Sequence, residues 1–232
     1  MIYVIGDIHG CKDKYEAMLS KLAPGEQDAV FVLGDVIDVG DYGIEILTDM
    51  MYRANIYPIL GEREYYAKKF LPLIAEKGST EKVLEELDGE EKEMLTKWLS
   101  MKSEKTVEAF LKLGEEDKEA VLDFLEEFAP FEEIECKGKK FILTHAGIRN
   151  FEEAKALEDY SDEDFVFAQT DYNRIYFSDA YLVTGHTPTV AIGKEYFGKV
   201  YAKKRHLALD CGAAFGGRLA AVCLDTLKVS YC

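Results

Sequence analysis

Residues 1–10 read MIYVIGDIHG, an apolar run followed at once by a loop of Gly, Asp and His. The run Ile2–Ile5 predicts a short strand. Residues 12–22 then carry apolar side chains at helical spacing, which predicts a helix after the loop. The chain therefore opens with a strand, a polar loop and a helix, the order typical of an α/β fold.

The same unit repeats along the first third of the chain. Residues 29–33 are strand-like, GDVIDVGDYG at 34–43 is a Gly/Asp loop, and residues 44–51 have a helical pattern. A third apolar run at 56–60 ends in GERE at 61–64. Strands separated by helices pair in parallel, and their polar loops then meet at one edge of the sheet. We therefore expect these loops to converge in space.

The middle and the end of the chain have different patterns. Residues 63–130 are acidic and helical in periodicity, which predicts a helical insertion within a single domain spanning residues 1–232. The last third turns toward strands, which we expect at 141–144, 181–184, 206–210 and 218–224, with a closing edge at 229–231.

Composition restricts the classes of partner. The formal net charge is −16, which argues against nucleic acid and anionic membranes as partners, because both are bound through Lys and Arg. Five scattered cysteines and the absence of a basic leader favour reduced thiols and a cytoplasmic location. No apolar run is long enough to suggest a membrane span.

Three of the four histidines lie in short phrases with Gly or Ala: His9 in GDIHG, His145 in THAG and His186 in TGHTP. Asp7 and Asp35 complete a set of two carboxylates and three imidazoles. Asp7 and His9 are two positions apart, so in an extended segment both side chains point the same way. This set suits two divalent cations, and its mixed ligands favour manganese, iron or zinc over calcium.

Taken together, the ordered phrases resemble the calcineurin-like metallophosphoesterases, and within them the small bacterial and phage members of the phosphoprotein phosphatase branch. GDIHG matches the first motif, LTHAGI and VTGHTPT match the two later histidine motifs, and LALDCGAAFGGRL matches the closing segment. GDVIDVG stands where the family has GDxxDRG, and GERE stands where it has GNHE. The resemblance runs nearly end to end and implies a four-layer α-β-β-α sandwich with metals at its rim.

The resemblance also implies roles for individual residues. Asp7, His9 and Asp35 would hold one cation, while Asp35, Glu62, His145 and His186 would hold the other. Manganese is the expected metal, with iron or zinc as alternatives. A hydroxide between the two ions would attack phosphorus.

Several phosphate-handling positions depart from the family. Glu62 replaces Asn, Arg63 replaces the histidine that protonates the leaving oxygen, and Val39 replaces an arginine of the phosphate clamp. Asp38, the acidic partner of that histidine, is expected to position Arg63. Arginine cannot give up a proton usefully near neutral pH, but it can bind phosphate or stabilise the leaving oxygen, so Asp38 and Arg63 are the expected catalytic residues.

A second clamp arginine is replaced by Gln169, so we assign Arg63 and Arg174 to substrate binding, with a plain surface charge as the alternative for Arg174. Asp210, on a late strand, is expected to support a histidine ligand.

These features predict a metal-dependent phosphoesterase that hydrolyses phosphomonoesters, with serine/threonine phosphoprotein as the substrate class that the resemblance suggests. Two alternatives stay open. The first is a dinucleoside polyphosphate hydrolase on the same scaffold. The second is a catalytically impaired pseudophosphatase that acts as a binding or regulatory protein.

Overall fold

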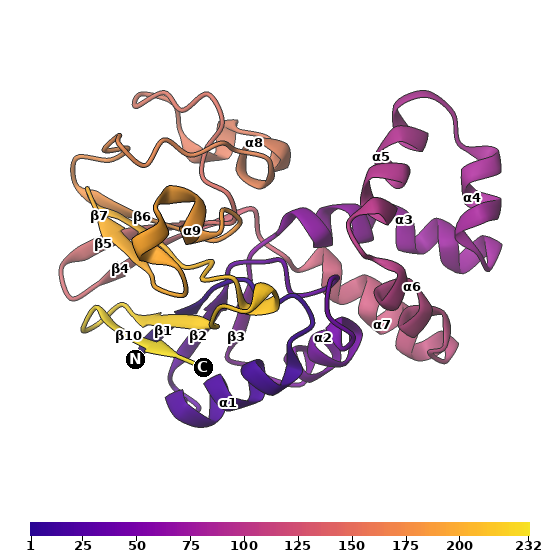
Figure 1. Ribbon diagram of the computed structural model, residues 1–232, viewed down its shortest axis with the longest axis horizontal. Helices are drawn as coiled ribbons and strands as arrows, with labels where there is room; N and C mark the ends of the chain where they lie inside the picture. The colour runs from indigo at the N-terminus through magenta and orange to yellow at the C-terminus, as the bar shows by residue number, and fades with distance from the viewer.

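Two five-stranded sheets form the centre of the molecule in the computed structural model, which describes residues 1–232 (Figure 1). The first sheet has the order β10-β9-β1-β2-β3 and the second the order β4-β5-β6-β8-β7. The strands of the first sheet are β1 Ile2–Ile5, β2 Ala29–Val32, β3 Ile56–Pro58, β9 Ala220–Cys223 and β10 Lys228–Tyr231. Those of the second are β4 Phe131–Cys136, β5 Lys139–Thr144, β6 Ala180–Thr184, β7 Tyr201–Lys203 and β8 His206–Ala208.

Both sheets are mixed and contain three neighbouring parallel strands. In the first sheet β1, β2 and β3 run parallel, β9 pairs antiparallel with β1, and β10 pairs antiparallel with β9. In the second sheet β5, β6 and β8 run parallel, while β4 and β7 are antiparallel at the edges. The predicted parallel crossovers are therefore confirmed, and the loops that leave the parallel strands share one rim of the sandwich.

The helices lie outside the sheets. Helices α1 Lys12–Leu22 and α2 Gly43–Met51 cover the first sheet, and the segment with α8 Asp162–Val166 covers the second (Figure 1). Short helical turns complete the second half: α9 Thr189–Ile192, η1 Leu157–Asp159, η2 Lys194–Tyr196 and η3 Ala213–Phe215. Apolar side chains such as Val4, Leu33, Phe141 and Val183 fill the space between the sheets. The four-layer sandwich is thus confirmed.

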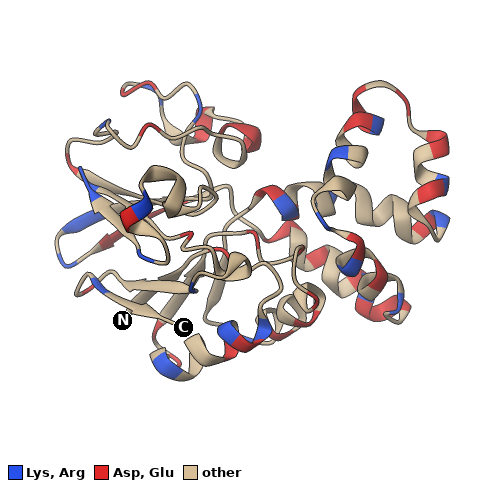
Figure 2. Cartoon of the chain, viewed as in Figure 1, with Lys and Arg blue, Asp and Glu red and all other residues tan.

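A helical lobe projects from one side of the sandwich (Figure 1). It contains α3 Glu62–Lys77, α4 Thr80–Glu86, α5 Gly89–Ser100, α6 Glu104–Leu111 and α7 Glu115–Glu126. Acidic residues are spread along its helices with basic residues among them (Figure 2). After α7 the chain returns to the sandwich, where Ala129 forms a parallel bridge with Ile59. None of the helices has both the length and the apolar character that a bilayer crossing requires.

Candidate metal centre

The loop after β1 carries Asp7 and His9, both nearly fully buried. The backbone N–H groups of Ile8 and His9 donate to the carbonyl of Asp35, with N···O distances of 3.1 and 2.8 Å. His9 and Asp35 both have φ of 48°, a left-handed conformation that non-glycine residues seldom adopt. The first two polar loops are therefore hydrogen-bonded to each other in a strained form that is common at functional sites.

Glu64, in helix α3, holds the loop after β2 in place. Its carboxylate accepts N–H bonds from Asp35, Val36 and Ile37 at 2.8, 2.8 and 3.2 Å. The loop also comes very close to Gly61, where an added Cβ would lie 2.3 Å from the nitrogen of Asp35. Only glycine allows this approach, which brings the start of α3 against Asp35.

The second sheet contributes His145 after β5 and His186 after β6. His145 Nδ1 lies 2.6 Å from the carbonyl oxygen of Leu33, so Nδ1–H donates across the sandwich and Nε2 is left free to bind a cation. The backbone N–H of His186 donates to Asp7 at 2.9 Å. Gly185 lies so close to Asp7 that an added Cβ would be 2.0 Å from Oδ1. Hydrogen bonds and a close backbone contact therefore join the two sheets at the rim that bears these residues.

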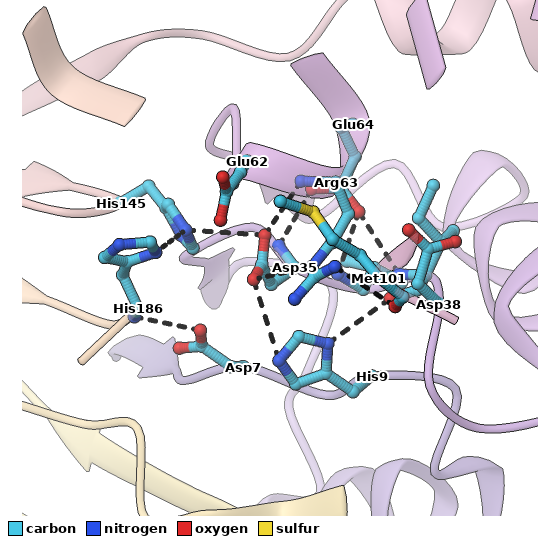
Figure 3. Close-up of polar contacts among 12 residues, drawn as sticks. Asp7, His9, Asp35, Asp38, Glu62, Arg63, Glu64, Met101, His145 and His186 are labelled. Atoms are coloured by element: carbon cyan, nitrogen blue, oxygen red, sulfur yellow. Dashed lines mark hydrogen bonds and ion pairs between the residues drawn. The ribbon is translucent and has the colours of Figure 1, made fainter. Parts of the chain in front are cut away.

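Five of the six predicted ligands come together in two groups that share one carboxylate (Figure 3). One group is Asp7, His9 and Asp35, and the other is Asp35, His145 and His186. Within each group the donor atoms lie within 4.8 Å of one another. Asp35 Oδ2 is 3.6 Å from His9 Nε2, and Oδ1 is 3.4 Å from His145 Nε2. Asp35 thus faces both groups, one oxygen toward each.

The donor set fits divalent cations. Asp7 Oδ1 is buried and has no hydrogen-bond partner, which is costly for a carboxylate unless a cation meets it. The two nearest imidazole nitrogens, His145 Nε2 and His186 Nδ1, are 3.1 Å apart, so both lone pairs are directed into one small space. Carboxylate and imidazole donors together suit manganese, iron or zinc.

The sixth predicted ligand, Glu62, begins helix α3 and is mostly buried. Its carboxylate lies beside the centre in Figure 3 but is outside both donor groups. Instead it forms an ion pair with Lys97 of α5, with Nζ 3.1 Å from Oε1. A lysine of the helical lobe therefore compensates the negative charge that glutamate adds at this position.

Arg63 lies over Asp35, not over Asp38. Its backbone N–H donates to Asp35 Oδ1 at 3.0 Å, its Nε is 3.5 Å from Oδ2, and its Nη1 donates to the carbonyl of Met101 at 3.2 Å. Asp38 instead accepts a hydrogen bond from Trp98 Nε1 at 2.8 Å. No hydrogen bond joins Asp38 to Arg63, although the charge of Asp38 helps to raise the pKa of Arg63, so the positioning role expected for Asp38 stays a prediction.

Arg174 lines an open cleft of about 590 Å³ beyond His145. Its guanidinium is exposed and packs over the rings of Phe151 and Tyr176, at 5.0 and 5.2 Å from the ring centroids. No carboxylate pairs with it, whereas Arg149 in the same cleft is bound to Asp164 at 2.8 Å. Arg174 Nη2 also donates to the carbonyl of Phe151 at 3.4 Å, so Arg174 is a cation held over aromatic rings without a carboxylate partner.

Comparison with known proteins matches residues 1–217 to the calcineurin-like phosphoesterases. This chain belongs to that family. Membership implies a phosphoester substrate and, together with the buried Asp/His groups, divalent metal ions.

The names of the individual relatives give several different activities, so they do not define one substrate for the family. A symmetrical bis(5'-nucleosyl)-tetraphosphatase from Wigglesworthia glossinidia brevipalpis is 29% identical over 100 residues, which cover 42% of this chain and 36% of that protein. The matched region thus spans about a third of the relative's length.

Several solved structures resemble the chain over its whole length. A candidate diadenosine tetraphosphatase superposes with a TM-score of 0.68 at 15% identity, covering 100% of this chain and 92% of that one. The cold-active protein-tyrosine phosphatase of a psychrophilic Shewanella species gives 0.55 at 13% identity, covering 99% and 79%. A serine/threonine phosphatase from Saccharomyces cerevisiae gives 0.51 at 12%, covering 99% and 78%. At these identities the likeness shows the fold alone.

Protonation states in this family member are set by burial. Burial lowers the pKa of His145 to about 4 and also lowers that of His9, so both imidazoles are neutral near pH 7, as metal ligands must be. Burial opposes ionisation of Asp35, but His145, His9 and Arg63 outweigh it and hold the pKa of this carboxyl below its usual range. The centre is therefore ready to bind cations without releasing protons from these groups.

Three structural residues were not predicted. Glu64 closes the GERE phrase, yet nothing in one sequence says that its carboxylate holds the loop before it. Lys97 and Trp98 lie in α5, and the helical periodicity of the sequence does not show that they reach Glu62 and Asp38. Asp210 also differs from expectation, because its Oδ1 accepts the N–H of Gly212 at 2.9 Å, a turn contact, and it does not support a histidine.

Proposed function

We propose that this protein is a metal-dependent phosphoesterase that hydrolyses a dinucleoside polyphosphate. Asp7, His9 and Asp35 would hold one cation, and Asp35, His145 and His186 the other, with Glu62 at its edge. Bound cations would polarise the phosphoryl group and activate water. The observation that carries the choice of substrate is Arg63, which stands where a proton donor is expected from the resemblance.

The leaving group decides between substrate classes. A serine alkoxide is a poor leaving group and needs a proton, and loss of a general acid costs about 10²–10⁴-fold. Arg63 stays charged and cannot supply that proton. The leaving group of a phosphoanhydride is itself a phosphate, which departs as an anion and needs only a neighbouring positive charge. A guanidinium provides that charge, so Arg63 fits anhydride cleavage better than ester cleavage.

The cleft beyond His145 supports the same substrate class. Phe151 and Tyr176 are buried beneath the guanidinium of Arg174, which offers the cleft a planar cation without a carboxylate partner. A guanidinium suits a nucleoside attached to phosphates, because it can stack on a base and also bind phosphate. The relatives described above as tetraphosphatases agree with this assignment. We assign Arg63 and Arg174 to substrate binding and infer that Asp38 acts on Arg63 through its charge.

Serine/threonine phosphoprotein, the substrate class first expected, becomes the second candidate. The protein phosphatases among the structural relatives support it only through the fold. The pseudophosphatase alternative would follow if purified protein bound cations but hydrolysed nothing.

The test is a substrate series with Mn²⁺ as the first metal and Fe²⁺ and Zn²⁺ as comparisons. We expect kcat/KM for diadenosine tetraphosphate to exceed that for a phosphoserine peptide at least 100-fold, with nitrophenyl phosphate between them. Arg63→His should raise the phosphoserine rate by about 10²-fold and change the tetraphosphate rate far less. Equal rates on tetraphosphate and phosphoserine would contradict the proposal.

We further propose a reducing compartment, the cytoplasm, as the site of action. All five thiols are unpaired. Cysteine labelling of protein in intact cells, without added reductant, would test this, and oxidised pairs would contradict it.

A further inference from the structure

One short segment of the helical lobe contacts the loop after β2 and the first turn of α3, where the residues that depart from the family pattern lie. It runs from Lys97 at the end of α5 to Thr106 in α6. From this segment, Lys97 Nζ lies 3.1 Å from Glu62 Oε1, and Trp98 Nε1 donates to Asp38 Oδ2 at 2.8 Å. Two of its backbone carbonyls accept hydrogen bonds, that of Met101 from Arg63 Nη1 at 3.2 Å and that of Lys102 from the N–H of Val39 at 3.1 Å. Thr106 Oγ1 accepts the N–H of Asp38 at 3.1 Å. Glu62, Arg63 and Val39, which all depart from the family pattern, thus share one structural neighbour.

Lys97 is the member of this segment that solvent reaches. Its side chain is 52% exposed while the Glu62 side chain is 11% exposed. Other lysines of the lobe pair with glutamates at the surface, as Lys69 does with Glu91. Lys97 instead crosses to the rim of the metal centre. Its ammonium group also lies over the ring of Phe167, 5.1 Å from the centroid.

The position of Phe167 connects Lys97 to the cleft. Phe167 lines the cleft that holds Arg174, and its ring also packs against Tyr66 of α3. Lys97 therefore lies between the metal centre, through Glu62, and the cleft, through Phe167. A chain of phosphates that crossed from one to the other would meet a cation at this point.

The positive charge of Lys97 can have two effects, one on Glu62 and one on a bound phosphate. It offsets Glu62, whose charge would otherwise repel a phosphate near the cations. Lys97 also retains exposed N–H donors, because an ammonium has three and Glu62 takes one. With Val39 in place of a clamp arginine, a cation for phosphate has to come from elsewhere in the chain.

We propose that Lys97 is a specificity-determining residue that binds a phosphate adjacent to the one undergoing hydrolysis. This rests on the proposed function for the identity of the substrate. Its consequence is selectivity for substrates with two or more linked phosphates over those with one.

The experiment uses binding as well as turnover. Calorimetry on the Mn²⁺-loaded protein compares inorganic tripolyphosphate with orthophosphate as ligands. Lys97→Met should raise the Kd of tripolyphosphate at least tenfold more than that of orthophosphate, and Lys97→Arg should restore most of the difference. Kinetics should agree: the loss in kcat/KM is expected to be at least tenfold greater for diadenosine tetraphosphate than for nitrophenyl phosphate, with the excess in KM.

The double variant Lys97→Met/Glu62→Gln separates the two effects. If Lys97 binds phosphate, removing the charge of Glu62 as well leaves tripolyphosphate binding weak. Full recovery in the double variant, or an equal loss for both ligands in Lys97→Met, would overturn the proposal. If wild-type protein binds tripolyphosphate through Lys97 but does not cleave diadenosine tetraphosphate, the proposed function fails and the Lys97 assignment stands. Because Lys97→Met leaves the mostly buried Glu62 without its partner, thermal melts of the single and the double variant check that both are folded, and Lys97→Arg keeps the ion pair.

Discussion

Asp35 connects the two donor groups of the metal centre, because each of its oxygens faces a different histidine. Its position depends on contacts from three directions: the first loop hydrogen-bonds to its carbonyl, Glu64 accepts its N–H, and the N–H of Arg63 donates to its carboxylate. A residue held this firmly is preorganised for binding and needs little adjustment when cations enter.

Replacement of Asp35 should therefore affect both cations together. We expect Asp35→Asn to weaken Mn²⁺ binding by more than the roughly 10–100-fold that loss of a residue supporting a ligand costs. Equilibrium dialysis with metal analysis measures this. Asp41→Asn, an exposed carboxylate of the same loop, is the matched control and should bind as wild type does. Retention of both ions by Asp35→Asn at wild-type affinity would show that the centre is elsewhere.

His206, the histidine outside the metal centre, makes stability depend on pH. It is buried against the ring of Tyr172, shares a hydrogen bond with Thr184, and its Nδ1 has no partner. Burial lowers its pKa from 6.5 to about 4. The unfolded chain therefore binds more protons than the folded one in this interval, so stability is complete above pH 6.5 and falls as pH drops toward 4.

The expected loss from His206 is about 3 kcal/mol across that interval, since each pKa unit corresponds to about 1.4 kcal/mol. Urea unfolding at pH 7 and pH 5 measures the slope for wild type and for His206→Gln, which keeps a partner for Thr184 but does not titrate. The variant should lose less stability over this step than wild type does. Identical slopes would mean that His206 binds its proton equally well in the folded and the unfolded chain.

At the scale of elements, helix α3 connects the metal centre to the lobe. Its first turn carries Glu62, Arg63 and Glu64, which contact Lys97, Asp35 and the loop after β2 respectively. The close approach at Gly61 fixes the start of the helix against that loop. A shift of α3 would therefore move the lobe and the loop together.

Glu64 should be one of the most sensitive positions in α3. Its three accepted N–H bonds are buried, and an amide in its place offers one oxygen while its NH₂ group faces a donor. We expect Glu64→Gln to lower the free energy of unfolding by about 2–4 kcal/mol. Glu76→Gln on the same helix, where the side chain is 68% exposed, is the control and should change it little. Denaturant melts compare the two, and similar stabilities would contradict the role given to Glu64.

The elements that sequence predicts best are those whose apolar runs are short and bounded by Gly or Asp. β1, β2, β5 and β6 are buried strands of this kind, and each prediction is confirmed. β4 was not predicted, because an edge strand reading FEEIEC is largely polar and owes its form to pairing with β5. Five of the six residues predicted as ligands, which follow buried strands, also come together in the structure. Lys97 was not predicted, because helical periodicity identifies a face but not the residue that meets a loop 35 positions away.

Across the whole molecule, the lobe and the sandwich share one apolar core. Trp98, Phe110 and Val121 from the lobe belong to the same buried cluster of 35 residues as Val30 and Val32 of β2. Contact between α3 and α7 extends this cluster through the base of the lobe. Although the lobe projects in Figure 1, it does not have a separate core of its own.

This shared core predicts that the chain unfolds as one domain. Trp98 is the single tryptophan and is fully buried, so its fluorescence reports the lobe, while far-UV circular dichroism reports all the elements. Because the lobe loses its core when the first sheet unfolds, the two signals should change at the same urea concentration with the same cooperativity. Ligand-free and Mn²⁺-loaded protein should both behave this way, with a higher midpoint when loaded, because cations bind the folded state. A fluorescence change that precedes the dichroism change in both forms would show instead that the lobe is an independent unit, and Trp98 would then also lose its contact with Asp38 before the sandwich opens.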